Sequence, residues 1–257
     1  MTESAPGWID RNHFLLRRLH SLTGIVPIGA FLIFHLLTNS TAFLGAQRYD
    51  AHVRQIHDLP WLPVIEILFI FLPLAFHGVY GVVIAWQGKL NVRQYPYMDN
   101  WRYTLQRVTA WITLVFVAIH LLHFRFAYWF GVPEYASAAP GFFAFTRQGF
   151  LHLWLPAWLW IWMYVIGVSA AAFHFSNGIV TFCITWGIAV GVESRKKLSL
   201  VAGALCIVLM LWGFVSLHAL TTMTGKTHGA AEVARGNQEC ISTPYMARHE
   251  TPSAARE

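Results

Sequence analysis

The chain has 257 residues, of which 56% are hydrophobic and only 12% are charged, and it contains 12 tryptophans and 19 phenylalanines. This composition excludes an ordinary soluble domain and indicates a helical membrane protein, because a helix that crosses a membrane needs about 20 apolar residues. The formal net charge of +6 is explained by Lys and Arg gathered in short loops, so it does not point to nucleic acid as a partner.

The N-terminal segment, residues 1–18, is expected to lie in the cytoplasm. It has no short apolar core followed by a small-residue cleavage site, so we expect no cleavable signal peptide and infer that the first span acts as its own insertion signal. The three cysteines lie far apart and form no C-x-x-C motif, which argues against a disulfide framework and against covalent cofactor attachment.

Apolar segments follow in chain order. The first three spans are predicted over residues 19–38, 62–86 and 104–126, and the last over residues 198–220. The domain that they form, residues 19–220, is predicted to be an all-α bundle. Residues 221–257 are polar and are predicted to be a disordered tail without chemistry.

The region between the third and last spans is ambiguous. Residues 148–192 contain no Asp, Glu, Lys or Arg. This uncharged stretch is too long for one span and barely long enough for two. Two spans would turn at Ser176-Asn177-Gly178 and would put the basic run 195–197 on the side opposite the other basic loops. We therefore predict one span, residues 158–182, preceded by an interfacial aromatic segment, and five spans in total.

The distribution of Lys and Arg near the spans predicts the orientation. The N-terminus and the second and fourth connections are richer in basic residues than the first and third connections. By the positive-inside rule the N-terminus is cytoplasmic and the C-terminus lies outside. The protein is thus expected to be a multi-pass membrane protein, with the lipid bilayer as its surroundings.

Each of the first four spans holds a histidine well inside it: His35, His77, His120 and His174. An intramembrane histidine is either a satisfied structural residue or a ligand. Because alternate spans run in opposite directions, His35 and His120 are predicted at one depth towards the outer side, and His77 and His174 at another towards the inner side. Two bis-histidine sites, one above the other, follow from this arrangement.

Neutral imidazole nitrogen suits iron, and a haem held by two axial histidines has no open coordination position. Structural zinc is the rival metal, but it prefers four protein ligands, whereas each predicted site offers two. The pattern therefore favours two haems, one held by each histidine pair.

Residues eleven apart on a helix share a face and lie about 16 Å apart along the axis. Gly24 and Thr109 stand eleven residues before His35 and His120, so these small residues are predicted to leave room at the depth of the inner haem. Gly78, Gly81 and Gly167 are candidates for similar clearance; the alternative is ordinary packing between membrane helices.

Glu66 stands eleven residues before His77, which places it at the depth of the outer haem. A carboxylate inside a membrane costs about 3 kcal/mol even on lenient insertion scales, so it is a functional candidate. Glu66 is predicted to take protons from a quinol or to donate a hydrogen bond to a quinone; the alternative is that it merely reaches interfacial water.

Cationic and hydroxyl side chains open the first and third spans on the inner side. The candidates for contact with haem propionates or a quinone carbonyl are Arg18, His20, Ser21 and Arg107. Topology alone also predicts arginines there.

Several segments together resemble a known family. The segments "RRLHSLTG", "FLIFHL", "EILFIFLPLAFHGVYG", "LQRVTAWITLVFVAIH" and "FHFSNG...TWGI" are similar to the cytochrome b subunit of succinate:quinone oxidoreductases, of the single-anchor, five-helix, di-haem type. The resemblance covers residues 12–192. It implies a five-helix bundle that encloses two stacked haems b, the proximal one ligated by His77 and His174 and the distal one by His35 and His120.

The resemblance also implies the function and the partners. A flavoprotein subunit and an iron–sulfur subunit would bind the cytoplasmic face, and electrons from succinate would reach a membrane quinone, expected to be menaquinone. His20 would support the inner haem without ligating iron. His123 departs from the family pattern and is a second candidate, besides His120, for ligation of the distal haem. The succinate chemistry would lie on the partners, since this sequence shows no flavin fingerprint, cysteine cluster or dicarboxylate site.

Three alternatives remain open from the sequence. A fumarate reductase subunit would share this architecture and work in the opposite direction. A di-haem cytochrome b of another quinone-linked dehydrogenase would have the same histidine pattern. A membrane protein without haem could use the histidines to satisfy one another or to relay protons.

Overall fold

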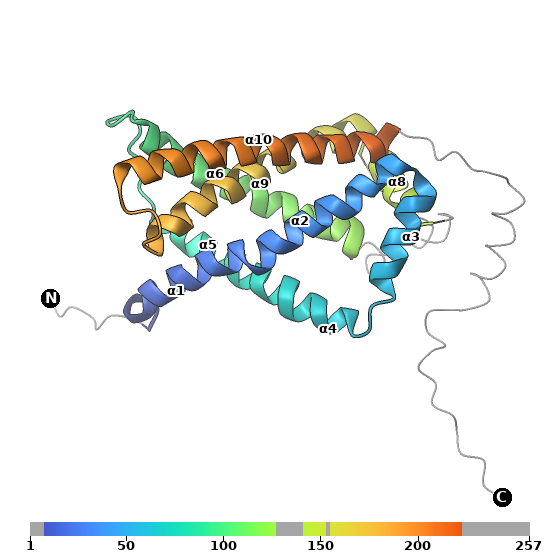
Figure 1. The fold of residues 1–257 in the computed structure, drawn as a ribbon, viewed down its shortest axis with the longest axis horizontal. Coiled ribbons are helices and arrows are strands. Elements are labelled where there is room, and N and C mark those ends of the chain that lie inside the picture. The colour runs from blue at the N-terminus through green and yellow to red at the C-terminus, as the bar shows by residue number, and fades with distance from the viewer. Residues whose placement is uncertain (1–7, 127–140, 153–154, 223–257) are drawn as a thin grey trace, which may run out of the picture. The chain divides into compact units, whose positions relative to one another are not determined.

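The computed structural model describes residues 8–126, 141–152 and 155–222. Every regular element in these ranges is a helix. Five stretches are long and apolar enough to cross a membrane: Arg11–Leu44, Leu62–Gln87, Met98–Arg125, Ala157–Thr185 and Val192–Thr222 (Figure 1). The predicted class, an all-α membrane protein with five spanning helices, is confirmed.

The first span is built from two helices, α1 (Trp8–Ile25) and α2 (Pro27–Ser40). They are separate elements because Pro27 has no N–H to donate and its ring crowds the preceding turn. The Val26 N–H still bonds to the Leu22 carbonyl at 2.9 Å, so the chain continues across the break. Helix α1 begins eleven residues before the predicted span, since hydropathy marks only the apolar part of a longer helix.

The second span contains a wider turn. Helix α4 (Leu62–Glu66) passes into a π-helical turn, η2 (Ile67–Phe71), and then into α5 (Leu72–Gln87). Pro73 is the second residue of α5. A proline inside a helix removes one backbone hydrogen bond, and its ring displaces the carbonyl of the residue four positions earlier. The wider π-helical turn accommodates this displaced carbonyl. The eleven-residue spacing between Glu66 and His77 therefore does not follow straight α-helical geometry.

The third and fourth spans are long continuous helices, α6 (Met98–His120) and α9 (Ala157–Thr185). A second π-helical turn, η3 (Leu121–Arg125), follows α6 at once. Helix α9 runs straight through Ser176, Asn177 and Gly178, which confirms the one-span interpretation of this region. It ends at Thr185, and Gly187, two residues later, has a φ of 71°, a left-handed conformation that glycine adopts without steric cost.

Among the described residues, two further helices lie outside the spans. They are α3 (Ala46–His57), reached through the 3-10 turn η1 (Thr41–Leu44), and α8 (Phe142–His152). They pack against each other at the same end of the bundle (Figure 1). The Phe143 N–H donates to Asp50 Oδ1 at 2.6 Å, which ties the start of α8 to α3.

The last span, α10 (Val192–Thr222), packs on α9 and α2. Helix α9 also contacts α1, α6 and α8, and it is the most buried of the five spans. Large apolar side chains elsewhere, such as Leu200 and Val79, are more than 70% exposed, as expected for surface that faces lipid. Of the predicted tail, Thr221 and Thr222 belong to α10, and residues 223–257 lie outside the described residues.

Candidate functional site

The imidazoles of His77 and His174 meet between α5 and α9. Their ring centroids are 6.2 Å apart and their planes are inclined by 87°. Two imidazoles on opposite sides of one metal ion, each bound through a bond of about 2 Å, would have centroids about 6 Å apart. The separation of this pair is therefore that of two ligands that share one ion.

The orientation of His77 is fixed by α1. His77 Nδ1 lies 2.9 Å from the carbonyl oxygen of His20, and since a carbonyl only accepts, Nδ1 carries the proton. The His20 ring stacks on His77 with centroids 4.0 Å apart and planes inclined by 13°. His20 thus supports His77, and the lone pair on His77 Nε2 is left available for a ligand.

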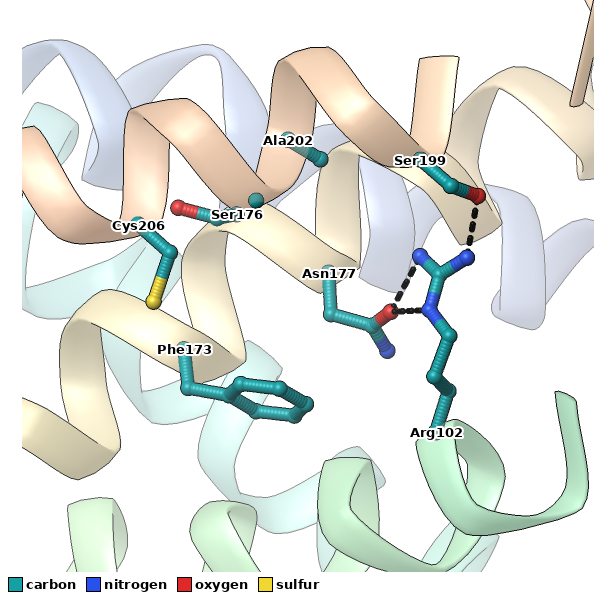
Figure 2. Close-up of a pocket in the computed structure, with 8 residues that line it drawn as sticks. Arg102, Phe173, Ser176, Asn177, Ser199, Ala202 and Cys206 are labelled. Carbon is teal, nitrogen blue, oxygen red and sulfur yellow. Dashed lines mark hydrogen bonds between the residues drawn. The ribbon is translucent and has the colours of Figure 1, made fainter. Parts of the chain in front are cut away.

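The orientation of His174 is fixed by α6. His174 Nδ1 lies 3.2 Å from both the backbone carbonyl and the side-chain Nε2 of Gln106, and Gln106 Nε2 also donates to the His174 carbonyl at 3.1 Å. Asn177 Nδ2 holds the Gln106 side chain through Oε1 at 2.7 Å. Figure 2 shows the end of this chain, where the Arg102 guanidinium donates to Asn177 Oδ1 at 2.7 and 3.0 Å and to Ser199.

A cavity of about 150 Å³ lies beside Arg102, with Phe173, Ser176 and Cys206 among the residues that line it (Figure 2). Pockets for drug-sized ligands measure roughly 300–1,000 Å³, so this cavity is too small for a porphyrin. We assign no ligand to it.

The second pair, His35 from α2 and His120 from the end of α6, lies closer to α3 and α8. The ring centroids are 5.6 Å apart and the planes are inclined by 83°. His120 Nδ1 lies 3.1 Å from the Tyr164 hydroxyl, whereas His35 Nε2 accepts from Asn39 Nδ2 at 3.0 Å. Ligation through His35 Nε2 therefore requires Asn39 to release it.

His123 takes no part in this pair. It is 3% exposed, and its two ring nitrogens lie 3.2 Å from the Tyr164 hydroxyl and 2.9 Å from the Gly149 carbonyl. Its ring also stacks on Trp160 at 4.3 Å. With both nitrogens bound to protein groups, His123 is placed to support a neighbour, not to bind a metal.

The backbone closely approaches an imidazole at two predicted glycines, Gly24 and Gly81; a Cβ on Gly81 would lie 3.1 Å from His20 Cε1. A Cβ on Gly24 would lie 2.5 Å from His77 Cε1, so only glycine permits this contact. Thr109, predicted to share that depth, is buried and donates to the Leu105 carbonyl at 2.7 Å. The expected clearance at Gly167 is wrong: a Cβ there would strike the Phe116 ring, so Gly167 serves the packing of α9 on α6.

The donor set fits iron that brings its own equatorial ligands. Within the described residues, no group of three or more His, Cys, Asp or Glu side chains comes together to hold an ion. Each pair supplies two imidazoles, which is what a metal inside a four-nitrogen macrocycle still requires. Because Nδ1 of His77 bonds to a backbone carbonyl, its Nε2 is left as a base.

Arginines gather at the end of the bundle near His77 and His174. Arg18 lies over the rings of Phe14 and Trp186 at 4.5 and 5.2 Å, and Arg107 lies over Tyr103 at 3.4 Å. The buried Nε atoms of Arg18 and Arg107 have no hydrogen-bond partner among the described residues, so both can donate to an anionic group.

Ser21 is less suited to bind a ligand. Its hydroxyl donates to the Arg18 carbonyl at 2.9 Å and accepts from Trp186 Nε1 at 3.1 Å.

Glu66 forms an ion pair across the second and third spans. Its Oε2 accepts from Arg125 Nη2 at 2.7 Å, and the Glu66 side chain is 20% exposed. Both residues flank π-helical turns: η2 begins after Glu66, and η3 ends at Arg125. Such turns occur frequently at functional sites.

Titratable groups outside the spans are perturbed at this end, among them Asp50 and His57. Burial raises the pKa of Asp50, against the Phe143 N–H, which lowers it. Burial also lowers the pKa of His57, and nearby Glu66 opposes that shift. The His57 ring stacks on Phe142 with centroids 4.9 Å apart.

The residues that hold the histidines in place were not among the residues predicted from the sequence. Gln106, Asn177, Tyr164 and Asn39 each bond to a histidine or to its support. One signal was present: a polar residue in an apolar helix, three or four residues from a histidine, as with Asn177 after His174 and Asn39 after His35.

Fold and site together define a five-span membrane protein that presents two paired-imidazole sites at the two ends of one bundle. No family model matches the chain. It is 39% identical over 207 residues to the succinate dehydrogenase cytochrome b558 subunit of Bacillus subtilis (strain 168), and the match covers 80% of this chain and 95% of that protein. The chain belongs to the family of cytochrome b subunits of succinate:quinone oxidoreductases, as the resemblance in its sequence implies.

Proposed function

We propose that this chain is the membrane-anchor subunit of a succinate dehydrogenase and that it holds two haems b, one at each histidine pair. The observation that carries the proposal is the meeting of imidazoles from four helices in two pairs, with centroids 6.2 and 5.6 Å apart. A bis-histidine haem supplies one-electron transfer and leaves no coordination position for oxygen.

The work of the chain's own residues is to present four neutral imidazoles in fixed orientations. His20 and Gln106 hold Nδ1 of His77 and His174 through their carbonyl oxygens. At His77 the carbonyl sets the tautomer that leaves Nε2 as a base and raises its basicity. At His174 both the backbone and the side chain of Gln106 hold Nδ1. Arg18 and Arg107, with their unpartnered buried Nε atoms, would bind the propionates at this end.

The charge distribution supports a cytoplasmic N-terminus. Arg17, Arg18, Arg102 and Arg107 lie at the end that holds His77 and His174, and the positive-inside rule places such an end in the cytoplasm. An iron–sulfur subunit and a flavoprotein subunit would dock there, because the relative is named as one subunit of a succinate dehydrogenase. The pair His77–His174 is then the proximal site, in a bacterial inner membrane.

The quinone site is proposed at the opposite end, near His35 and His120. Glu66 is the candidate for proton exchange with the quinone, menaquinone in our proposal. Arg125 holds Glu66 Oε2 at 2.7 Å, and an arginine stays charged at any working pH. The ion pair therefore fixes the Glu66 side chain between the second and third spans, where Glu66 would exchange protons with the quinone.

Substitution of the histidines tests the proposal. In the whole complex, His174→Ala is expected to remove the low-spin signal of one haem, and His120→Ala that of the other, in electron paramagnetic resonance (EPR) spectra and in haem-to-polypeptide ratios. His218→Ala, an exposed histidine on α10 that bonds to Thr222, is the matched control and should keep both signals.

Persistence of both six-coordinate signals in His174→Ala would overturn the assignment. Identification of the subunits that co-purify with the wild-type chain separates succinate dehydrogenase from another quinone-linked dehydrogenase. Flavoprotein and iron–sulfur subunits of a succinate-oxidising enzyme are the expected result.

A further inference from the structure

A chain of three hydrogen bonds lies behind His120. His120 Nδ1 is 3.1 Å from the Tyr164 hydroxyl, and the same hydroxyl is 3.2 Å from His123 Nδ1. His123 Nε2 is 2.9 Å from the Gly149 carbonyl. The chain thus joins η3, α9 and α8 around one histidine of the second pair.

The donor and acceptor of each hydrogen bond in this chain follow from the Gly149 carbonyl, the group farthest from His120. The Gly149 carbonyl can only accept, so His123 Nε2 carries a proton. His123 is 3% exposed, and a neutral ring is expected because burial of a charge is costly. Its Nδ1 is then an acceptor, and the Tyr164 hydroxyl must donate to it.

The consequence reaches His120. Once the Tyr164 proton points at His123, the lone pairs of the Tyr164 oxygen face His120 Nδ1. His120 must then carry its proton on Nδ1, and its Nε2 is left as the base that faces His35. The tautomer of His120 is thereby specified by a backbone carbonyl on another helix.

We propose that Tyr164 and His123 are positioning residues that fix the tautomer and the ring orientation of His120 and so tune the affinity and the potential of the group it ligates. This inference rests on the proposed function, in which His120 is an axial ligand. An acceptor on Nδ1–H makes the imidazole a stronger donor and favours the oxidised metal. Loss of the acceptor should therefore raise the reduction potential.

This support differs from that of the first pair. His77 and His174 are held by carbonyl oxygens of the backbone, which side-chain substitution does not remove. The support of His120 consists of two side chains, so it can be deleted without loss of the ligand. The rings around it, Trp160 and Phe124 at 4.3 and 4.4 Å from His123, hold the chain in a packed core.

The test uses Tyr164→Phe in the whole complex, with redox titration and EPR of both haems. We expect both haems to remain, with changed g-values for one and an upward shift of its midpoint potential. Outer-shell partners typically change metal affinity by about tenfold or more, and a tenfold change in the reduction equilibrium corresponds to about 59 mV for one electron.

A second variant and a control accompany it. His123→Gln keeps Tyr164 in place but frees its proton to rotate, so the same shift with a smaller amplitude is expected, even if Tyr164→Phe fails to assemble. Tyr80→Phe removes another buried tyrosine hydroxyl, one that bonds weakly to the His13 carbonyl at 3.5 Å, and should leave the potential of this haem unchanged.

The outcomes separate the two proposals. If His120→Ala keeps both haems, the proposed ligand is wrong and the positioning role falls with it. If His120→Ala removes one haem while Tyr164→Phe and His123→Gln leave its g-values and potential at wild-type values, the positioning proposal alone is overturned.

Discussion

Gly24→Ala is expected to empty the site between His77 and His174 while the other pair is spared. Gly24 lies on α1 directly against the His77 ring. An added Cβ would be 2.5 Å from His77 Cε1 and 3.0 Å from Nδ1, and the shortest ordinary contact is 3.4 Å. The ring must therefore move by most of the 0.9 Å deficit.

The cost follows from what holds the ring. His77 is clamped between Gly24 and the stacked His20 ring at 4.0 Å, so movement breaks its bond to the His20 carbonyl. Overpacking costs about 1–3 kcal/mol, and the lost hydrogen bond adds about 0.5–1.5 kcal/mol. A total of about 1.5–4.5 kcal/mol corresponds to a loss of affinity of roughly 10-fold to 2,000-fold.

The assay is the haem-to-polypeptide ratio of the purified complex, together with reduced-minus-oxidised spectra at low temperature. Gly203→Ala is the matched control, because a Cβ on this α10 glycine meets nothing within 4 Å. Gly24→Ala should retain about one haem of two, and Gly203→Ala both. Full haem content with unchanged spectra in Gly24→Ala would refute the proposed placement of the ligand.

Two further predictions concern the other end of the bundle. Glu66→Gln should leave both haem spectra unchanged and lower quinone reductase activity. Glu193→Gln, which breaks an exposed pair with Lys196, should change neither the spectra nor the activity. Full activity in Glu66→Gln would exclude the proton role. His57 has a folded-state pKa below its ordinary value of 6.5 because of burial, so its contribution to stability is present above pH 6.5 and is lost as the pH falls through the folded-state pKa. His57→Phe keeps an aromatic ring against Phe142. When the pH is lowered from about 7.5 to about 5.5, its melting temperature should fall by less than that of the wild type. An equal fall in both proteins would contradict this.

The sequence was sufficient for the number of spans and for which histidines meet. Span number follows from apolar length, and depth follows from the alternating direction of the spans, so His35 is expected beside His120 and His77 beside His174. The structure brings both pairs together. That they ligate haem stays a prediction.

The supports could not be predicted from the sequence, for a physical reason. Whether Gln106 reaches His174, or Tyr164 reaches His120, depends on the rotation of two helices about their axes. Periodicity fixes such a rotation poorly when most faces of a helix are apolar. In the π-helical turns after Glu66 and His120 the rotation per residue differs from the constant 100° of an α-helix, so side-chain directions beyond them cannot be predicted from sequence spacing.

Helices α6 and α9 pass both histidine pairs without interruption, whereas the first and second spans are broken near Pro27 and Pro73. On α9, Tyr164 touches one pair and His174 belongs to the other; at 1.5 Å per residue their ten-residue separation is about 15 Å. The constant rise of an unbroken helix thus fixes the distance between the two histidine pairs, which in the proposed function is the distance for electron transfer. Insertions or deletions in the loops leave that gap unchanged, while a single residue added between Tyr164 and His174 would rotate one end against the other by about 100°.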